Sequence, residues 1–87
     1  MIHDVKIRRH FADAVECGDK TFEVRFNDRG YQRGDWLRFR VIEPGTGETI
    51  KDITDHPLYG EERRITYVMS GNGISPGYVV LGLGKPV

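Results

Sequence analysis

A short run of polar residues at the start of a predicted strand carries the groups that could do chemistry in this chain. They are an ammonium, a hydroxyl, a carboxylate and a guanidinium, supplied by Lys20, Thr21, Glu23 and Arg25. Because side chains alternate along a strand, Thr21, Glu23 and Arg25 should share one face. Such a face can bind an anion or a nucleobase. It can also support catalysis, with Lys20 as a nucleophile or Glu23 as a general base.

A helix and a strand must position these groups. Residues 8–17 carry apolar side chains at three- and four-residue steps, which predicts an amphipathic helix that Gly18 ends. Residues 20–26 alternate between polar and apolar side chains, which predicts a strand. The apolar residues of this strand should point into the core, and they are Phe22, Val24 and Phe26.

The remainder of the chain predicts short strands joined by turns rich in glycine and proline. These strands are expected at residues 2–7, 36–42, 48–53, 63–69 and 78–83. With one helix and five or six strands, residues 1–87 should form a single α+β domain that is mostly β. We expect a small barrel of mainly antiparallel strands, with the N-terminal helix at one end.

Strand 36–42 divides its side chains into a core row and an outer row. The core row is Leu37, Phe39 and Val41, and the outer row is Trp36, Arg38 and Arg40. An aromatic ring beside guanidinium groups is typical of surfaces that bind single-stranded nucleic acid, although a solvated barrel edge has the same pattern. In strand 63–69, Ile65, Tyr67 and Met69 should share one face. Strand 78–83 should be covered on both faces, with Tyr67 and Tyr78 in the core.

Composition limits the class of protein. The 13 basic and 13 acidic residues balance, but residues 41–62 carry one basic residue against six acidic ones, and residues 63–87 carry three against none. An anion-binding face should therefore use the two ends of the chain. The single cysteine, Cys17, excludes an internal disulfide, and no apolar run is long enough for a membrane helix. We expect a soluble, cytoplasmic monomer.

The three histidines, with Asp4 and Asp55, offer possible metal ligands. Their spacing is not that of a zinc site, so we expect neither a metal nor a cofactor. His3 is of more interest as a hydrogen-bonding neighbour of Lys20 or Glu23.

The run from Gly18 to Arg25 resembles the G-x-K-x-x-E-x-R motif of the ASCH family, whose fold is PUA-like. Further positions resemble the ASCH-like branch known as DUF3850, and they are residues 3–7, Phe11, Val15, and residues 22–25, 27–29, 34–35, 65–68 and 76–82. The resemblance implies binding of RNA or a modified nucleotide in a cleft that holds the motif. One similar branch hydrolyses acetylated cytidine with a lysine at the position of Lys20, but it has threonine where this chain has Glu23. Another similar protein is a metal-dependent ribonuclease.

We therefore expect a module that binds RNA or a nucleotide. The expected site residues are Lys20, Thr21, Glu23, Arg25, His3, Trp36, Arg38 and Arg40. Two alternatives remain open. One is a small hydrolase, either an amidohydrolase or a ribonuclease, that uses Lys20 and Glu23 as catalytic residues. The other is a protein-interaction module encoded by a phage or another mobile element.

Overall fold

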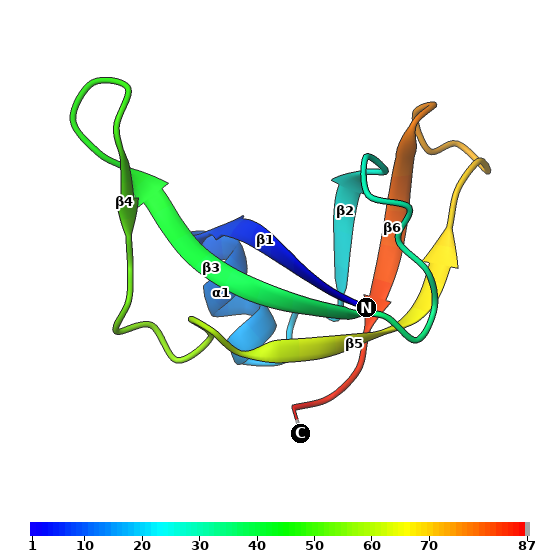
Figure 1. Cartoon of the computed structure of the whole chain (residues 1–87), viewed down its shortest axis with the longest axis horizontal. Coiled ribbons are helices and arrows are strands. Elements are labelled where there is room, and N and C mark those ends of the chain that lie inside the picture. The colour runs from blue at the N-terminus through cyan, green and yellow to red at the C-terminus, as the bar shows by residue number, and fades with distance from the viewer. Residues whose placement is uncertain (87) are drawn as a thin grey trace.

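The computed structural model describes residues 1–86 and shows six strands and one helix (Figure 1). The strands are β1 (Ile2–Arg8), β2 (Phe22–Phe26), β3 (Trp36–Pro44), β4 (Ile50–Asp52), β5 (Glu62–Met69) and β6 (Tyr78–Leu83). The helix, α1 (Arg9–Glu16), lies between β1 and β2 in the chain. The predicted elements are thus all present, with bounds that differ by a few residues from those expected.

The strands form one sheet in the order β1–β3–β5–β6–β2, with β4 added to β3 as a hairpin. The β1–β3 pairing is parallel and the other pairings are antiparallel. The prediction of mainly antiparallel strands is therefore confirmed. The mostly β fold with one helix is confirmed, but the sheet does not close as a full barrel would, because within residues 1–86 the terminal strands β1 and β2 do not pair with each other. We call the gap between these two edge strands the seam.

The core lies inside the bend of this sheet. Leu37, Phe39 and Val41 of β3 are fully buried, so the predicted core row is confirmed. They lie in register with the inward-facing residues His3, Val5 and Ile7 of β1. In α1 the buried residues are Ala12 and Val15, whereas Phe11 is 44% exposed. The side of the helix that carries Ala12 and Val15 therefore faces the core, and Phe11 lies beside the seam.

The buried and exposed faces of strand β2 are the reverse of those predicted. Its apolar side chains, Phe22, Val24 and Phe26, are exposed, whereas Glu23 is 4% exposed. Arg25, on the same face as Glu23, is half-buried. The alternation was correctly recognised, but the inner side of β2 faces the unpaired edge of β1. Polar groups on that edge need hydrogen-bond donors, which apolar side chains cannot supply.

Strand β5 departs from the predicted alternation because of a β-bulge. The pairing of β5 with β6 shifts register between Ile65 and Tyr67. A bulge adds one residue to a strand, so the residues after it turn to the opposite face. Ile65 is therefore fully buried while Tyr67 is 62% exposed. Tyr78 is also exposed, so the predictions that Tyr67 and Tyr78 lie in the core and that β6 is covered on both faces are wrong.

Candidate functional site

Three charged residues of the predicted motif form a compact triad. The Lys20 ammonium donates a hydrogen bond to Glu23 Oε1, and Arg25 Nη1 donates to Glu23 Oε2 over 3.1 Å. Each carboxylate oxygen thus receives one cation. A buried carboxylate is unfavourable unless it is paired, and here the pairing is supplied on both sides.

The turn after α1 fixes Lys20 at the edge of this triad. Gly18 has φ +88°, a left-handed conformation that glycine adopts readily, and its N–H donates to Val15 O. The Lys20 N–H then donates to Ala14 O over 2.9 Å. Two backbone hydrogen bonds to the last turn of the helix therefore determine where the lysine side chain begins.

The Lys20 side chain lies between two aromatic rings. Its Nζ is 5.0 Å from the centroid of Phe11 and 5.3 Å from that of Phe22. An ammonium at this distance from a ring face is attracted by the ring quadrupole. An ammonium that donates to Glu23 has no lone pair, so nucleophilic attack by Lys20 would first require loss of a proton.

Two arginines bridge the seam where strand pairing is missing. Arg25 Nη1 donates to Lys6 O over 2.8 Å, and Arg29 Nη1 donates to Asp4 O. Both carbonyls belong to β1 and face away from its partner β3. The guanidinium groups therefore replace part of the backbone hydrogen bonding that a closed barrel would have.

A cavity of about 450 Å³ opens at the seam, between β1, α1 and β2. We call it the seam pocket. Its apolar lining comes from Ile7, Phe11, Phe22 and Val24, and its charged lining comes from Lys6, Arg8, Lys20, Glu23 and Arg25. Four cations thus surround one carboxylate that is already paired. The pocket combines a positive potential with two aromatic walls, which suits an anion that carries a flat apolar group.

Thr21 does not line the seam pocket. Its side chain lies at a smaller hollow of about 200 Å³, which it shares with Lys20 and with the C-terminal residues Gly84, Lys85 and Pro86. The predicted wall of Lys20, Thr21, Glu23 and Arg25 is therefore divided, with three of the four residues in one pocket. Lys20 separates the two hollows.

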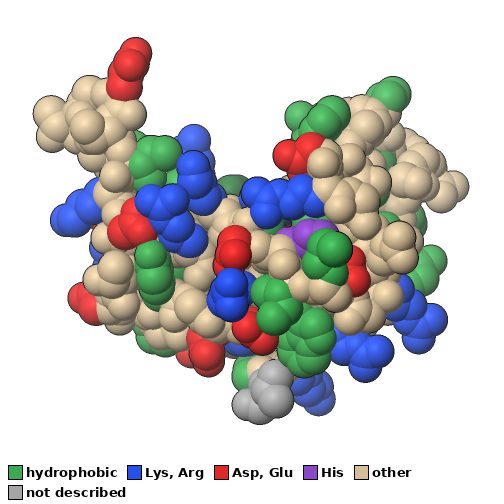
Figure 2. Space-filling view, viewed as in Figure 1, with side chains coloured by type: hydrophobic (Ala, Val, Ile, Leu, Met, Phe, Trp, Pro, Cys, Tyr) green, Lys and Arg blue, Asp and Glu red, His purple; other side chains and the backbone are tan. Residues whose placement is uncertain are grey.

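The outer face of β1 and β3 carries a row of charged side chains next to the seam pocket. Lys6 lines the pocket and lies in register with Arg40, while Asp4 lies in register with Arg38. Figure 2 shows Lys and Arg side chains gathered beneath the notch between the two raised arms of the molecule, with Asp and Glu among them. Through Lys6 the pocket is thus continuous with a surface of mixed charge.

A family model described as a domain of unknown function, DUF3850, matches residues 2–83. The chain belongs to the DUF3850 family. The comparison with curated proteins gave no match. The matched range contains the triad, the seam and every residue that lines the seam pocket, so the pocket is built entirely from the family's domain.

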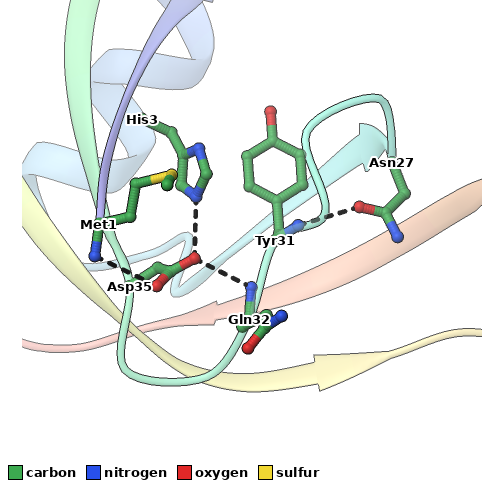
Figure 3. Close-up of polar contacts among 6 residues, drawn as sticks. All are labelled: Met1, His3, Asn27, Tyr31, Gln32 and Asp35. Carbon is green, nitrogen blue, oxygen red and sulfur yellow. Dashed lines mark hydrogen bonds and ion pairs between the residues drawn. The ribbon is translucent and has the colours of Figure 1, made fainter.

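In this DUF3850 chain His3 lies away from Lys20 and Glu23. Its Nε2 donates to Asp35 Oδ2 over 2.9 Å, and its ring packs edge-on against the buried Tyr31 (Figure 3). Asp35 also accepts from the N-terminal amine of Met1 and from the Gln32 N–H. The hydrogen bond from His3 contributes most to lowering the pKa of the Asp35 carboxyl. These contacts tie the N-terminus to the turn before β3, so His3 has a structural role here.

The outer row of β3 is largely engaged in ion pairs. Arg38 donates to both oxygens of Asp4, at 2.6 and 3.1 Å, and lies 3.7 Å from Glu62. Arg40 binds both oxygens of Asp52 at 2.7 Å. Trp36 is half-buried at the start of the strand. These arginines can contact a ligand only through donors that their carboxylate partners leave unused.

The Asp52 carboxyl provides a pH prediction for this surface. Hydrogen bonds from Arg40 and from the Tyr59 hydroxyl lower its pKa from the ordinary 3.8 to about 2. A group with a lowered folded-state pKa contributes stability above its unfolded pKa, and this contribution is lost as the pH falls through the folded value. The stability that Asp52 adds over an Asp52→Asn variant should therefore disappear between pH 4 and 2.

Carboxyl titration by NMR checks this directly. We expect the Asp52 signal to titrate near pH 2 in the native chain, and at a higher pH in Tyr59→Phe, which lacks one donor. A midpoint near 3.8 in both proteins would contradict the network.

The pocket contains functional candidates that the sequence did not indicate. Lys6, Arg8 and Phe11 come from β1 and α1, and each looked like an ordinary exposed or core residue. Nothing in the sequence signals that β1 and β2 remain unpaired and face each other across the seam.

Among residues 1–86, no three His, Cys, Asp or Glu side chains gather as a metal site would require. Over the same residues, no helix has the length and apolar character needed to cross a membrane.

Proposed function

We propose that this DUF3850 domain binds RNA or a modified nucleotide in the seam pocket. The observation that carries the proposal is the pocket lining, where four cations face one paired carboxylate beside the rings of Phe11 and Phe22. In this arrangement a phosphate contacts Lys6, Arg8 or Arg25, and a base stacks on an aromatic wall.

The sequence predicted that Glu23 contacts the ligand, but in this proposal it has a structural role. Both its oxygens already accept from Lys20 and Arg25, and its side chain is buried. Glu23 therefore orients the two cations and does not read a base edge. Lys20 and Arg25 remain half-buried at the pocket and keep further donors for a ligand.

The resemblance of Gly18–Arg25 to the ASCH motif supports the same proposal. We infer that the DUF3850 domain is a branch of the ASCH group with a PUA-like fold, opened at the seam. The motif residues Lys20, Glu23 and Arg25 then act in the same cleft that the resemblance implies.

A binding assay tests the proposal with Arg8 and Phe11, two exposed pocket residues that make no hydrogen bond to Glu23. The probes are inorganic phosphate, nucleoside monophosphates and a single-stranded RNA of about ten nucleotides, long enough to extend beyond one site. We expect Arg8→Ala to weaken RNA binding by about tenfold and to lower its salt dependence by about one phosphate contact. We expect Phe11→Ala to weaken it by a comparable amount through lost stacking.

Arg33→Ala is the matched control, because Arg33 is an exposed arginine outside the pocket lining. Equal affinities for Arg8→Ala and Arg33→Ala, or affinity that does not change with salt, would argue against the proposed site. Cleavage of the RNA that Lys20→Ala abolishes would instead identify the domain as a ribonuclease.

A further inference from the structure

The outer face of β2, β6 and β5 carries an apolar surface that faces away from the core. Six of its side chains are Phe22, Val24, Phe26, Tyr67, Tyr78 and Val80. All except Val80 are more than 40% exposed. This surface follows from the inverted face of β2 and from the bulge in β5.

The strand register arranges this face in three rows across the sheet. Gly82 lies between Phe22 and Tyr67, Val80 lies between Val24 and Met69, and Tyr78 lies opposite Phe26. None of the residues in these three rows is charged. Soluble proteins seldom leave so continuous an apolar sheet face open to water, and such faces mark sites of association.

The face is built of exposed rings without an open pocket between them. The position of Gly82, between Phe22 and Tyr67, is closed by Thr66 and by the Cβ of Tyr67. Phe26 contacts Tyr78 edge-on, with 5.5 Å between ring centroids, and its ring lies against Gly77. Two such faces can pack on each other about a twofold axis, which places the same patch of both copies in contact.

The exposed apolar area is of the size that the apolar centre of a dimer interface needs, and a polar rim makes up the remainder. Aromatic residues have roughly 150–250 Å² each, so four half-exposed rings and Val24 present about 400–500 Å² of apolar surface. A standard interface buries about 800 Å² per partner, with an apolar centre and a polar rim. Nucleic acid fits this face less well, because its affinity depends on cations that the three rows lack.

We propose that two copies of this chain associate through the outer face of β2, β6 and β5, packed sheet on sheet. The sequence analysis expected a monomer, and it placed Phe22, Val24, Phe26 and Tyr67 in the core. Phe22 and Val24 belong to this surface and to the lining of the seam pocket, whereas Phe26 and Tyr67 do not line the pocket, so substitutions at Phe26 and Tyr67 test association apart from the proposed nucleotide site.

Sedimentation equilibrium on the whole chain, without RNA, tests the proposal across about 1 μM to 1 mM, where moderate affinities fall. We expect the wild type to reach twice the mass of one chain within this range. Tyr67→Glu and Phe26→Glu should each raise the dissociation constant by at least about thirtyfold, since each places a charge in the apolar centre. Ile50→Glu is the matched control, because Ile50 is equally exposed but lies on the β4 hairpin.

A wild type that stays monomeric throughout this range would overturn the proposal. So would a dimer that Tyr67→Glu and Phe26→Glu leave intact, or one that Ile50→Glu weakens as much. A different outcome would make the face a base-stacking surface instead. In that case single-stranded RNA quenches the tyrosine fluorescence of a monomeric wild type. The double variant Tyr67→Phe/Tyr78→Phe still binds RNA but no longer shows this quenching. Because sedimentation is measured without RNA, the result for dimer formation is independent of nucleotide binding.

Discussion

Glu23→Gln should lower the free energy of unfolding by about 2–4 kcal/mol, although it replaces one oxygen by a nitrogen of the same size. Glu23 is buried, and it is the shared partner of Lys20 and Arg25. The amide removes the negative charge and leaves two neighbouring cations without compensation. Urea denaturation of the wild type and the variant, followed by circular dichroism, measures the difference.

Glu43→Gln is the control for this prediction. Glu43 pairs with Arg9 at 3.6 Å, but both side chains are a third or more exposed. Exposed pairs contribute about 0–1 kcal/mol, so this variant should unfold almost like the wild type. A double-mutant cycle between Lys20→Met and Glu23→Gln then isolates the Lys20–Glu23 coupling. Equal effects of Glu23→Gln and Glu43→Gln would show that the triad is not buried and paired as described.

Ile65→Ala should lower the free energy of unfolding by about 2–5 kcal/mol, whereas Tyr67→Ala should lower it by less than about 1 kcal/mol. The two residues are two positions apart on β5, so strict alternation would place them on the same face. The bulge between them separates a fully buried isoleucine from a largely exposed tyrosine. The free energy of unfolding is measured at a concentration where the chain is monomeric, so the difference between the two variants depends on the bulge alone.

The same denaturation experiment includes its own internal comparison, because Tyr67 is the larger side chain. If burial did not differ, its truncation would have the greater effect. A larger loss for Tyr67→Ala than for Ile65→Ala would contradict the bulge and would return Tyr67 to the core. Hydrogen exchange of the backbone amides around Thr66 gives a second measurement, since a bulge leaves local groups unpaired.

Much of the fold follows from local patterns in the sequence. Leu37, Phe39 and Val41 alternate with charged residues, and a strand with such alternation has only one face that can be buried. The end of α1 just before Gly18 also has a local cause, because the left-handed conformation of residue 18 favours glycine. These predictions were confirmed because the physical causes act within a few residues.

The errors have a non-local cause. Alternation in β2 reveals two faces but not which of them is buried, and the usual rule that apolar residues face inward gave the wrong choice. The inner side of β2 faces the free edge of β1, where the Lys6 carbonyl accepts from Arg25. A bulge such as the one in β5 likewise depends on the pairing with β6, which the sequence of β5 alone does not contain.

The sequence by itself determined the strands, the helix, the central core row and the grouping of Lys20, Glu23 and Arg25, since each depends on short-range periodicity and spacing. Only the tertiary structure decided that the sheet stays open, that Glu23 is buried between two cations and that the aromatic side chains of β2 face outward. The physical reason is that these features depend on which strand edges meet, and that is settled by pairings between residues far apart in the chain. The seam pocket and the apolar face are both products of that one arrangement.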